Sequence, residues 1–136
     1  MSGPVGLDHV AVAVHDLDAA VRRYESLGLR CQHVEDVPSE GVRVAFLPAG
    51  EAALELLQPL QPDGPVARFL QARGEGLHHV ALRVPDLDAA LERARAAGVR
   101  VLEPAPRLGS RGRRVAFLHP KDTSGVLVEL VEAARR

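Results

Sequence analysis

The chain contains one segment twice, and this duplication constrains its fold more than any other feature. Residues 7–30 and 77–100 are identical at 13 of 24 aligned positions, at an offset of 70 (79 − 9) without a gap. Two later segments repeat at offsets of 71 (115 − 44) and 74 (128 − 54), namely 44–47 with 115–118 and 54–57 with 128–131. A repeat of this length indicates one structural unit present in two copies, neither of which is expected to be stable alone.

Each copy has the pattern of one strand, one helix and three further strands. Residues 7–14 are rich in valine and alanine, which favours a strand, and Asp16 is a suitable N-cap for a helix that begins at Leu17. We expect strands of the first copy at about 7–14, 29–37, 41–48 and 52–58. In the second copy we expect a helix at 86–97 and strands at about 77–84, 99–103, 113–118 and 126–132. A short helix is predicted at 65–73, with Pro65 in its first turn.

The predicted fold class is therefore α+β, with tandem βαβββ modules. Joining the two copies in a curved, mixed, eight-stranded sheet with the helices outside buries an apolar face of every element. We interpret residues 1–136 as a single domain made of module 1 (about 6–60), a linker with a short helix (61–76) and module 2 (about 77–132).

Composition excludes several classes of protein. The 136 residues are 46% hydrophobic and 26% charged, which is typical of one globular domain. No apolar run approaches the roughly 20 residues of a membrane-spanning helix, and the N-terminus has no pattern of a secretory signal. The net charge of −1 implies no general attraction to nucleic acid or membrane, and Cys31 alone cannot form an internal disulfide. We expect a cytoplasmic protein.

Two histidines lie at equivalent places in the predicted first strands of the copies. His9 shares a strand face with Ala11 and Ala13, because alternate residues of a strand point the same way. His79 with Ala81 repeats the arrangement. These small neighbours leave room for a ligand on the histidine side.

Two glutamates lie at equivalent places in the predicted last strands, which are otherwise apolar. Glu55 and Glu129 each stand between aliphatic residues, and an acid kept within an apolar strand is costly without a use. A single strand histidine or glutamate is more often an ordinary core or surface residue. The repetition of both types in both copies favours a metal site made of His9, Glu55, His79 and Glu129, a mixed N/O set suited to divalent transition metals.

Three further features leave alternatives open. The segment from Arg107 to Lys121 contains four arginines, one lysine and no acid, which suits either a phosphorylated ligand or a solvated loop. His78 is on the strand face opposite His79, so we interpret it as structural. His119 precedes Pro120 and could contact a ligand or cap a turn.

The repeated His-Val-Ala start with paired carboxylates resembles the vicinal oxygen chelate superfamily and, within it, the methylmalonyl-CoA epimerase family. The resemblance covers Leu7 to about Glu132. Its most specific segments are Gly41 to Leu47, Leu54 to Leu60, Gly74 to His79 and His119 to Leu130.

The resemblance implies interconversion of (R)- and (S)-methylmalonyl-CoA by removal of the α-proton, with a divalent ion stabilising the enolate. It implies Co²⁺ first, with Mn²⁺, Ni²⁺, Zn²⁺ or Mg²⁺ as alternatives, a small acyl-CoA substrate and a homodimer. Glu129 then serves as ligand and base, and Lys121 and His119 are candidates for substrate binding. Some members have a second glutamate where this chain has Val44, so the second acid/base group is not identified, and the loop residue Glu40 is expected at the surface.

Other members of the superfamily are rival interpretations. A glyoxalase I-type lyase acting on a glutathione hemithioacetal also uses two histidines and two carboxylates. A non-catalytic antibiotic-binding protein of the same fold needs no metal, which the four ligand-type residues argue against. Ring-cleaving dioxygenases use two histidines and one carboxylate and are usually longer.

Overall fold

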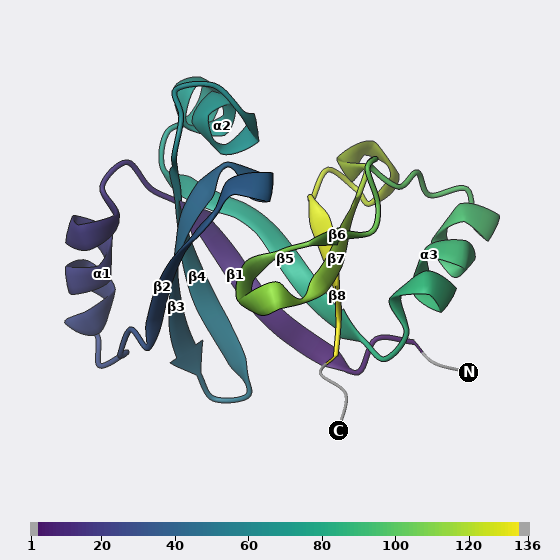
Figure 1. Cartoon of the computed structure of the whole chain (residues 1–136), viewed down its shortest axis with the longest axis horizontal. Helices are drawn as coiled ribbons and strands as arrows, with labels where there is room; N and C mark the ends of the chain where they lie inside the picture. Colours follow the sequence, from purple (N-terminus) through teal and green to yellow (C-terminus); the bar gives the residue numbers. More distant parts are fainter. Residues whose placement is uncertain (1–2, 134–136) are drawn as a thin grey trace. The chain divides into compact units, whose positions relative to one another are not determined.

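The computed structural model describes residues 3–133, which form two compact units (Figure 1). The N-terminal unit is His9–His78, and the C-terminal unit combines the segment before His9 with the segment from His79 onward. Each unit corresponds closely to one copy of the repeat. The single domain with its module bounds stays a prediction.

The N-terminal unit contains one copy of the predicted pattern. Its elements are β1 (Gly6–Ala13), of which residues 6–8 belong to the C-terminal unit, α1 (Leu17–Glu25), β2 (His33–Val37), the 3-10 helix η1 (Pro38–Glu40), β3 (Val42–Ala49), β4 (Ala52–Pro59) and α2 (Pro65–Arg73). The strand order is β2-β3-β4-β1, with β1 and β4 parallel and the other pairs antiparallel. Helix α2 has the bounds predicted for the linker helix.

The C-terminal unit repeats this topology. Its elements are β5 (Gly76–Val84), of which residues 76–78 belong to the N-terminal unit, α3 (Leu87–Ala96), β6 (Arg107–Leu108), η2 (Ser110–Gly112), β7 (Arg114–Leu118), η3 (Pro120–Asp122) and β8 (Val128–Glu132). The strand order is β5-β8-β7-β6, with β5 and β8 parallel and the other pairs antiparallel, as in the N-terminal unit. The eight strands of the predicted mixed sheet are therefore present among the described residues, and the fold class is confirmed.

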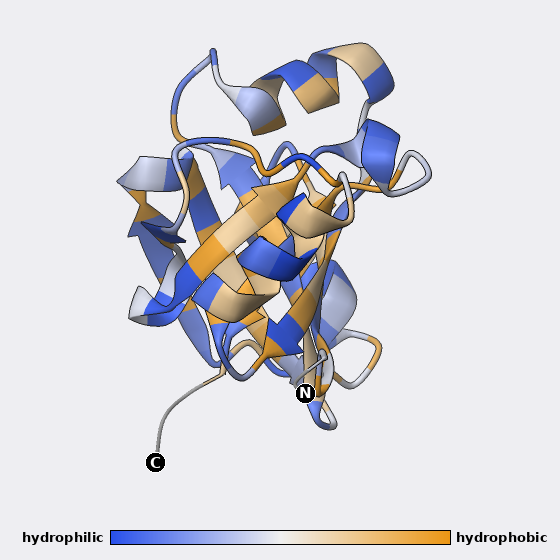
Figure 2. Cartoon of the chain, turned by 90° about the vertical axis from the view of Figure 1, so that its right-hand side faces the viewer, coloured by the Kyte–Doolittle hydropathy of each residue, from blue (hydrophilic) through white to orange (hydrophobic). Residues whose placement is uncertain are grey.

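One face of each unit's strands packs against the helix that follows its first strand, which is α1 or α3. Helix α1 begins after Asp16, whose side chain accepts a hydrogen bond from the Ala19 N–H at 3.1 Å, as an N-cap does. Leu17 is buried against Leu47 and Leu56 of the strands. In the other unit, Leu87 and Leu91 of α3 pack on Leu130. Figure 2 shows hydrophobic and hydrophilic residues interspersed along both the helices and the strands.

The opposite face of the N-terminal unit carries His9 and Glu55, and we call it the ligand-bearing face. Ala11 and Ala13 are fully buried on it, and α2 packs over its far part through Val66 and Leu70. The alanines thus lie under other side chains rather than in open space.

Two predicted strands begin at different residues from those expected. The strand predicted at 29–37 begins only at His33, because the Cys31 N–H bonds to the Glu25 carboxylate at 3.0 Å instead of joining the ladder. The strand predicted at 99–103 is reduced to an isolated bridge at Val101, and β6 forms later in the chain. Pro104 and Pro106 lie between them and lack the N–H that a strand ladder requires.

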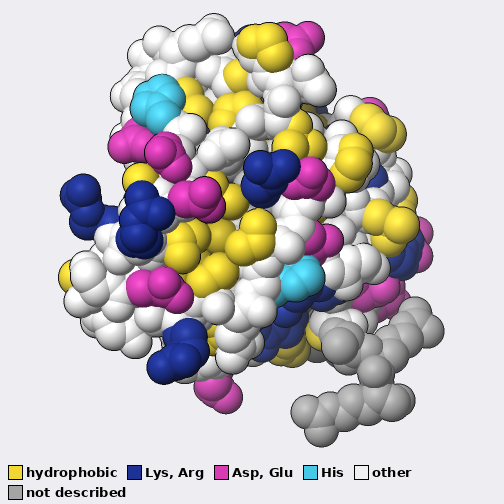
Figure 3. Space-filling model, turned by 60° about the vertical axis from the view of Figure 1, so that its left-hand side comes forward, with side chains coloured by type: hydrophobic (Ala, Val, Ile, Leu, Met, Phe, Trp, Pro, Cys, Tyr) yellow, Lys and Arg dark blue, Asp and Glu magenta, His cyan; other side chains and the backbone are white. Residues whose placement is uncertain are grey.

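The surface carries charges of both signs in an interspersed pattern, with hydrophobic residues between them on the face drawn in Figure 3. Within residues 3–133, none of the helices has the length and hydropathy needed to span a bilayer.

Candidate metal centre

The N-terminal unit brings His9 and Glu55 together. Parallel strands β1 and β4 place Ala11 beside Glu55, and His9 is one strand repeat before Ala11 on the same face. The distance from His9 Nε2 to Glu55 Oε1 is 3.5 Å, and the two side chains are only 3% and 5% exposed. An imidazole and a carboxylate are thus held close together away from solvent.

The C-terminal unit repeats this arrangement with His79 and Glu129. Parallel strands β5 and β8 place Ala81 beside Glu129, which is the same register as in the other unit. His79 Nε2 lies 3.1 Å from Glu129 Oε1, and the side chains are 6% and 8% exposed. The ring of Phe117 packs against His79 nearly at right angles, with 5.1 Å between the ring centroids. Each unit therefore holds one equivalent His/Glu pair.

Each pair fits a divalent metal ion. Two ligands about 2.1 Å from an ion, on neighbouring corners of an octahedron, lie about 3.0 Å apart. The separations of 3.5 and 3.1 Å between nitrogen and oxygen are close to that value. Imidazole nitrogen and carboxylate oxygen suit Co²⁺, Mn²⁺, Ni²⁺ and Zn²⁺ better than ions that prefer thiolate.

The other candidate histidines and the lysine have local contacts. His78 packs edge-on against Phe69 with 5.1 Å between ring centroids, which agrees with its interpretation as structural. The Nδ1 atom of His119 accepts a hydrogen bond from the Lys121 N–H at 3.2 Å and so caps η3. Lys121 itself is exposed. The cap is one of the two roles considered for His119, and it leaves the other ring nitrogen of His119 available to a ligand.

The turn at residues 119–122 is held in place by hydrogen bonds to its aspartate. Asp122 accepts hydrogen bonds from the backbone N–H of Arg100 at 2.9 Å and from its guanidinium at 2.8 and 3.1 Å. These bonds hold the pKa of Asp122 at about 2, below its ordinary value of 3.8. The acid therefore anchors the turn that presents Lys121.

Part of the basic segment is engaged by acids that sequence reasoning did not connect with it. Arg113 donates two hydrogen bonds to the buried carboxylate of Asp8, at 2.7 and 2.8 Å, and Arg83 donates a third at 3.2 Å. Arg114 pairs with Glu132 and Asp88. These two arginines have a structural role, which narrows the candidates for an anionic ligand.

A second repeated contact also went unnoticed in the sequence. Gln58 accepts a hydrogen bond from the Leu17 N–H at 2.7 Å, and Glu132 accepts one from the Leu87 N–H at 3.0 Å. Both pairs have the offsets of the repeat, 70 (87 − 17) and 74 (132 − 58), so the alignment of the copies contained the signal. Each contact satisfies an N–H at a helix start.

The fold and the two His/Glu pairs define a class of proteins. Residues 8–117 match the family model described as the Glyoxalase/Bleomycin resistance protein/Dioxygenase superfamily. Because this match covers well over half of the chain, the protein belongs to that superfamily.

Particular relatives narrow the resemblance to epimerases. An ethylmalonyl-CoA/methylmalonyl-CoA epimerase of Cereibacter sphaeroides is 44% identical over 127 residues, which are 91% of this chain and 95% of the relative. The crystal structure of methylmalonyl-CoA epimerase from Mycobacterium tuberculosis has a TM-score of 0.92 and 44% identity, covering 97% of this chain and 90% of that one. A methylmalonyl-CoA epimerase in complex with methylmalonyl-CoA and NH4+ has a TM-score of 0.93 and 43% identity, covering 97% and 96%.

Proposed function

We propose that this protein is a metal-dependent epimerase that interconverts (R)- and (S)-methylmalonyl-CoA. The observation that carries the proposal is the pair of buried His/Glu contacts in equivalent registers, found in a chain similar to methylmalonyl-CoA epimerases over most of its length. The expected reaction class is proton transfer at the α-carbon of an acyl-CoA thioester.

We assign His9, Glu55, His79 and Glu129 as ligands of one divalent ion, with Co²⁺ first and Mn²⁺, Ni²⁺, Zn²⁺ or Mg²⁺ as alternatives. The equivalence of the two pairs by duplication supports this assignment, because two half-sites with two donors each complete a four-ligand set. Burial supports it as well, since a charge removed from water needs a partner. The ion supplies positive charge that stabilises the enolate of a malonyl thioester.

The chain's own residues then carry the proton. Glu129 is assigned as ligand and base, because its carboxylate is buried beside His79 and can take the α-proton of a thioester held at the site. His79 is held in its orientation by Phe117. Inversion also requires that a proton return on the opposite face of the α-carbon, which calls for an acid/base group in addition to Glu129.

Other parts of the proposal concern the surroundings of the reaction. Lys121 and His119 are assigned to substrate binding, because Asp122 and the His119 cap fix a turn that carries an exposed ammonium group. We further propose a homodimer located in the cytoplasm, which follows from the resemblance to the epimerase family.

The test is solvent exchange of the α-hydrogen of methylmalonyl-CoA, followed by NMR in D₂O. Protein treated with a chelator and then supplied with Co²⁺ should exchange the hydrogen and interconvert the epimers, and the chelated protein should not. Equal exchange with and without metal would exclude the metal-dependent mechanism.

The same preparation separates the rival functions. Turnover of the methylglyoxal–glutathione hemithioacetal without turnover of methylmalonyl-CoA would establish a glyoxalase I-type lyase instead. A protein that binds no divalent ion and turns over neither substrate would favour a non-catalytic binding protein.

A further inference from the structure

A histidine and a glutamate lie together on β2, the edge strand of the N-terminal unit. His33 Nε2 is 3.1 Å from Glu35 Oε1, and the side chains are 48% and 28% exposed. We propose that Glu35, oriented by His33, is the second acid/base group of the epimerisation. This inference rests on the proposed function and adds a proton carrier to it.

The strand registers place this pair on the ligand-bearing face. Residues directly opposite each other in neighbouring strands point to the same side of a sheet. Two rows of such residues cross β2, β3 and β4, namely His33–Phe46–Glu55 and Glu35–Val44–Leu57. Val37, which shares a β2 face with Glu35, is buried with Ala11 and Leu57. His33 and Glu35 therefore share a face with Glu55.

The separation suits a group that acts on a bound substrate without binding the ion. Neighbouring strands lie about 4.8 Å apart, so the backbones of β2 and β4 are separated by about 10 Å. Val44 is buried between them and contributes neither an acid nor a base. The side chain of Glu35 can extend over Val44 toward β4. A thioester bound near Glu55 would extend toward β2, so that its α-carbon comes within reach of the Glu35 carboxylate.

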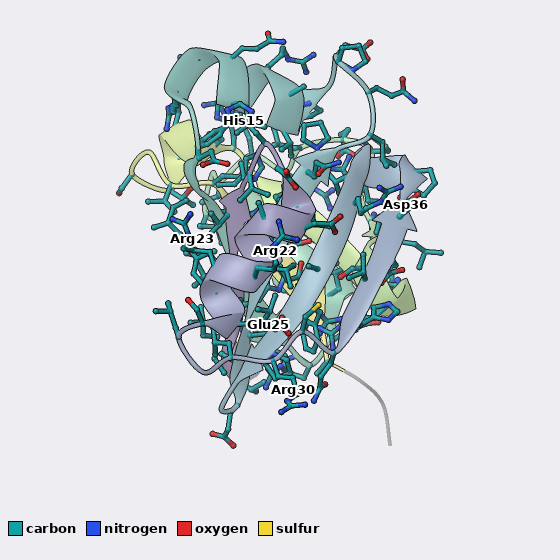
Figure 4. All side chains as sticks on the ribbon, turned by 90° about the vertical axis from the view of Figure 1, so that its left-hand side faces the viewer. His15, Arg22, Arg23, Glu25, Arg30 and Asp36 are labelled. Carbon is teal, nitrogen blue, oxygen red and sulfur yellow. The ribbon has the colours of Figure 1, made fainter. Side chains whose placement is uncertain are left out.

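Two other acids near this sheet, Asp36 and Glu75, have different positions. Asp36 and Arg43 are opposite each other in register and joined by a 2.7 Å ion pair. Each directly adjoins Glu35 or Val44 in its strand, and adjacent residues of a strand point to opposite faces, so this ion pair lies on the other face. Figure 4 shows Asp36 on the edge strand in the view that has α1 in front of the strands. Glu75 accepts a hydrogen bond from the His15 N–H at 2.8 Å. Among the described residues of β2, β3 and β4, the acids of the ligand-bearing face are Glu35 and Glu55.

The C-terminal unit carries the opposite charge at the corresponding place. Arg107 of β6 is opposite Val115 of β7, as Glu35 is opposite Val44, and the two valines are repeat equivalents with an offset of 71 (115 − 44). The Arg107 guanidinium lies 5.4 Å from the centre of the Phe117 ring. A base is therefore available at the edge strand of the N-terminal unit, while the same position of the repeat offers a cation.

In the proposed step, the α-carbon loses one proton to Glu129 and gains one from Glu35. The α-C–H bond breaks toward Glu129, and its electron pair enters the thioester as an enolate. A proton held by Glu35 then forms the new C–H bond on the other face. The proton gained by Glu129 and the one lost by Glu35 re-equilibrate through water, to which the His33–Glu35 pair is open. The reverse reaction uses the two carboxylates in exchanged roles.

The test compares Glu35→Gln with Asp36→Asn, a matched control one residue along the same strand on the other face. We expect E35Q to lower kcat about 100-fold, the size of a lost general acid/base group, and D36N to stay within about twofold of the parent. Binding of Co²⁺, titrated by calorimetry, should be unchanged in both variants. Exchange of the α-hydrogen in E35Q should persist from one epimer and be lost from the other, and Glu35→Asp should restore part of kcat.

A structural role of Glu35 would not produce exchange from one epimer alone. If E35Q matches D36N in kcat, or exchanges both epimers equally, or loses Co²⁺ binding, the assignment of Glu35 is wrong while the proposed function stands. If the parent protein does not epimerise methylmalonyl-CoA, both proposals fail together.

Discussion

The two units pair their strands in the same registers but carry different side chains on their edge strands, β2 and β6. In each, an alanine of the first strand lies beside a buried glutamate, and a histidine two residues earlier completes the pair. At the edge strand, the N-terminal unit presents Glu35 where the C-terminal unit presents Arg107. The part of the repeat that is equal, one His/Glu pair in each unit, suits the proposed metal binding. The part that differs suits an unsymmetrical substrate, which needs a proton carrier on one side and a cation on the other.

The largest expected effect tests the equality of the two His/Glu pairs. His9→Ala and His79→Ala should each lower kcat/KM by roughly 10³-fold, because losing several kcal/mol of charge stabilisation has that consequence. Both should also reduce bound Co²⁺ well below one ion per chain, measured by metal analysis after gel filtration. His78→Ala is the matched control, because His78 packs on Phe69. Two ions per chain in the parent protein, each lost separately, would contradict a shared site.

The next effect concerns a contact found in the C-terminal unit. Asp8→Ala removes the carboxylate that binds Arg83 and Arg113, and its side chain is only 2% exposed. Leaving a buried charge without its partner should lower the free energy of unfolding by about 3 kcal/mol. Urea unfolding of metal-free protein measures this loss without interference from the neighbouring His9. A loss below that of an exposed ion pair such as Arg95–Glu103 would show that the Asp8 cluster is not stabilising.

A smaller effect compares the two helix starts. Glu132→Ala removes the acceptor of the Leu87 N–H together with the partner of Arg114, and should cost about 2 kcal/mol. Gln58→Ala removes only the acceptor of the Leu17 N–H and should cost about 1 kcal/mol. Thermal unfolding of both variants tests the order of the two losses. A larger loss in Gln58→Ala than in Glu132→Ala would mean that the ion pair between Arg114 and Glu132 lowers the stability of the folded chain.

The smallest effect depends on pH. Because the Asp122 pKa is about 2 when folded and 3.8 ordinarily, ionised Asp122 stabilises the folded chain above about pH 4. This contribution is lost as the pH falls through the folded value. The difference in unfolding midpoint between the parent protein and Asp122→Asn should therefore shrink between pH 4 and pH 2. A difference that stays constant over this range would show that the charge of Asp122 does not contribute to the stability of the turn.

Much of the candidate metal centre could be predicted from the sequence, because its residues lie in the repeat itself. His9 and His79 follow from alternation in strands, and Glu55 and Glu129 stand out as acids among aliphatic residues. The helix start at Asp16 follows from local chemistry, and the structure confirms it. The role of these four residues as ligands stays a prediction until metal is measured.

Tertiary structure alone decided which distant residues meet. Asp8 and Arg113 are 105 positions apart (113 − 8), and nothing local to either indicates their contact. The register of β2 on β3 places Glu35 and Asp36 on opposite faces, and a shift of one residue would exchange them.

The sequence by itself determined the duplication, the α+β class and two equivalent His/Glu pairs, because those depend on periodicity and residue type within short segments. Only the folded chain decided where β6 forms, which arginines of the basic segment pair with acids, and which acid of β2 shares a sheet face with Glu55. These depend on strand register and on contacts between residues far apart in the chain, which local patterns do not encode.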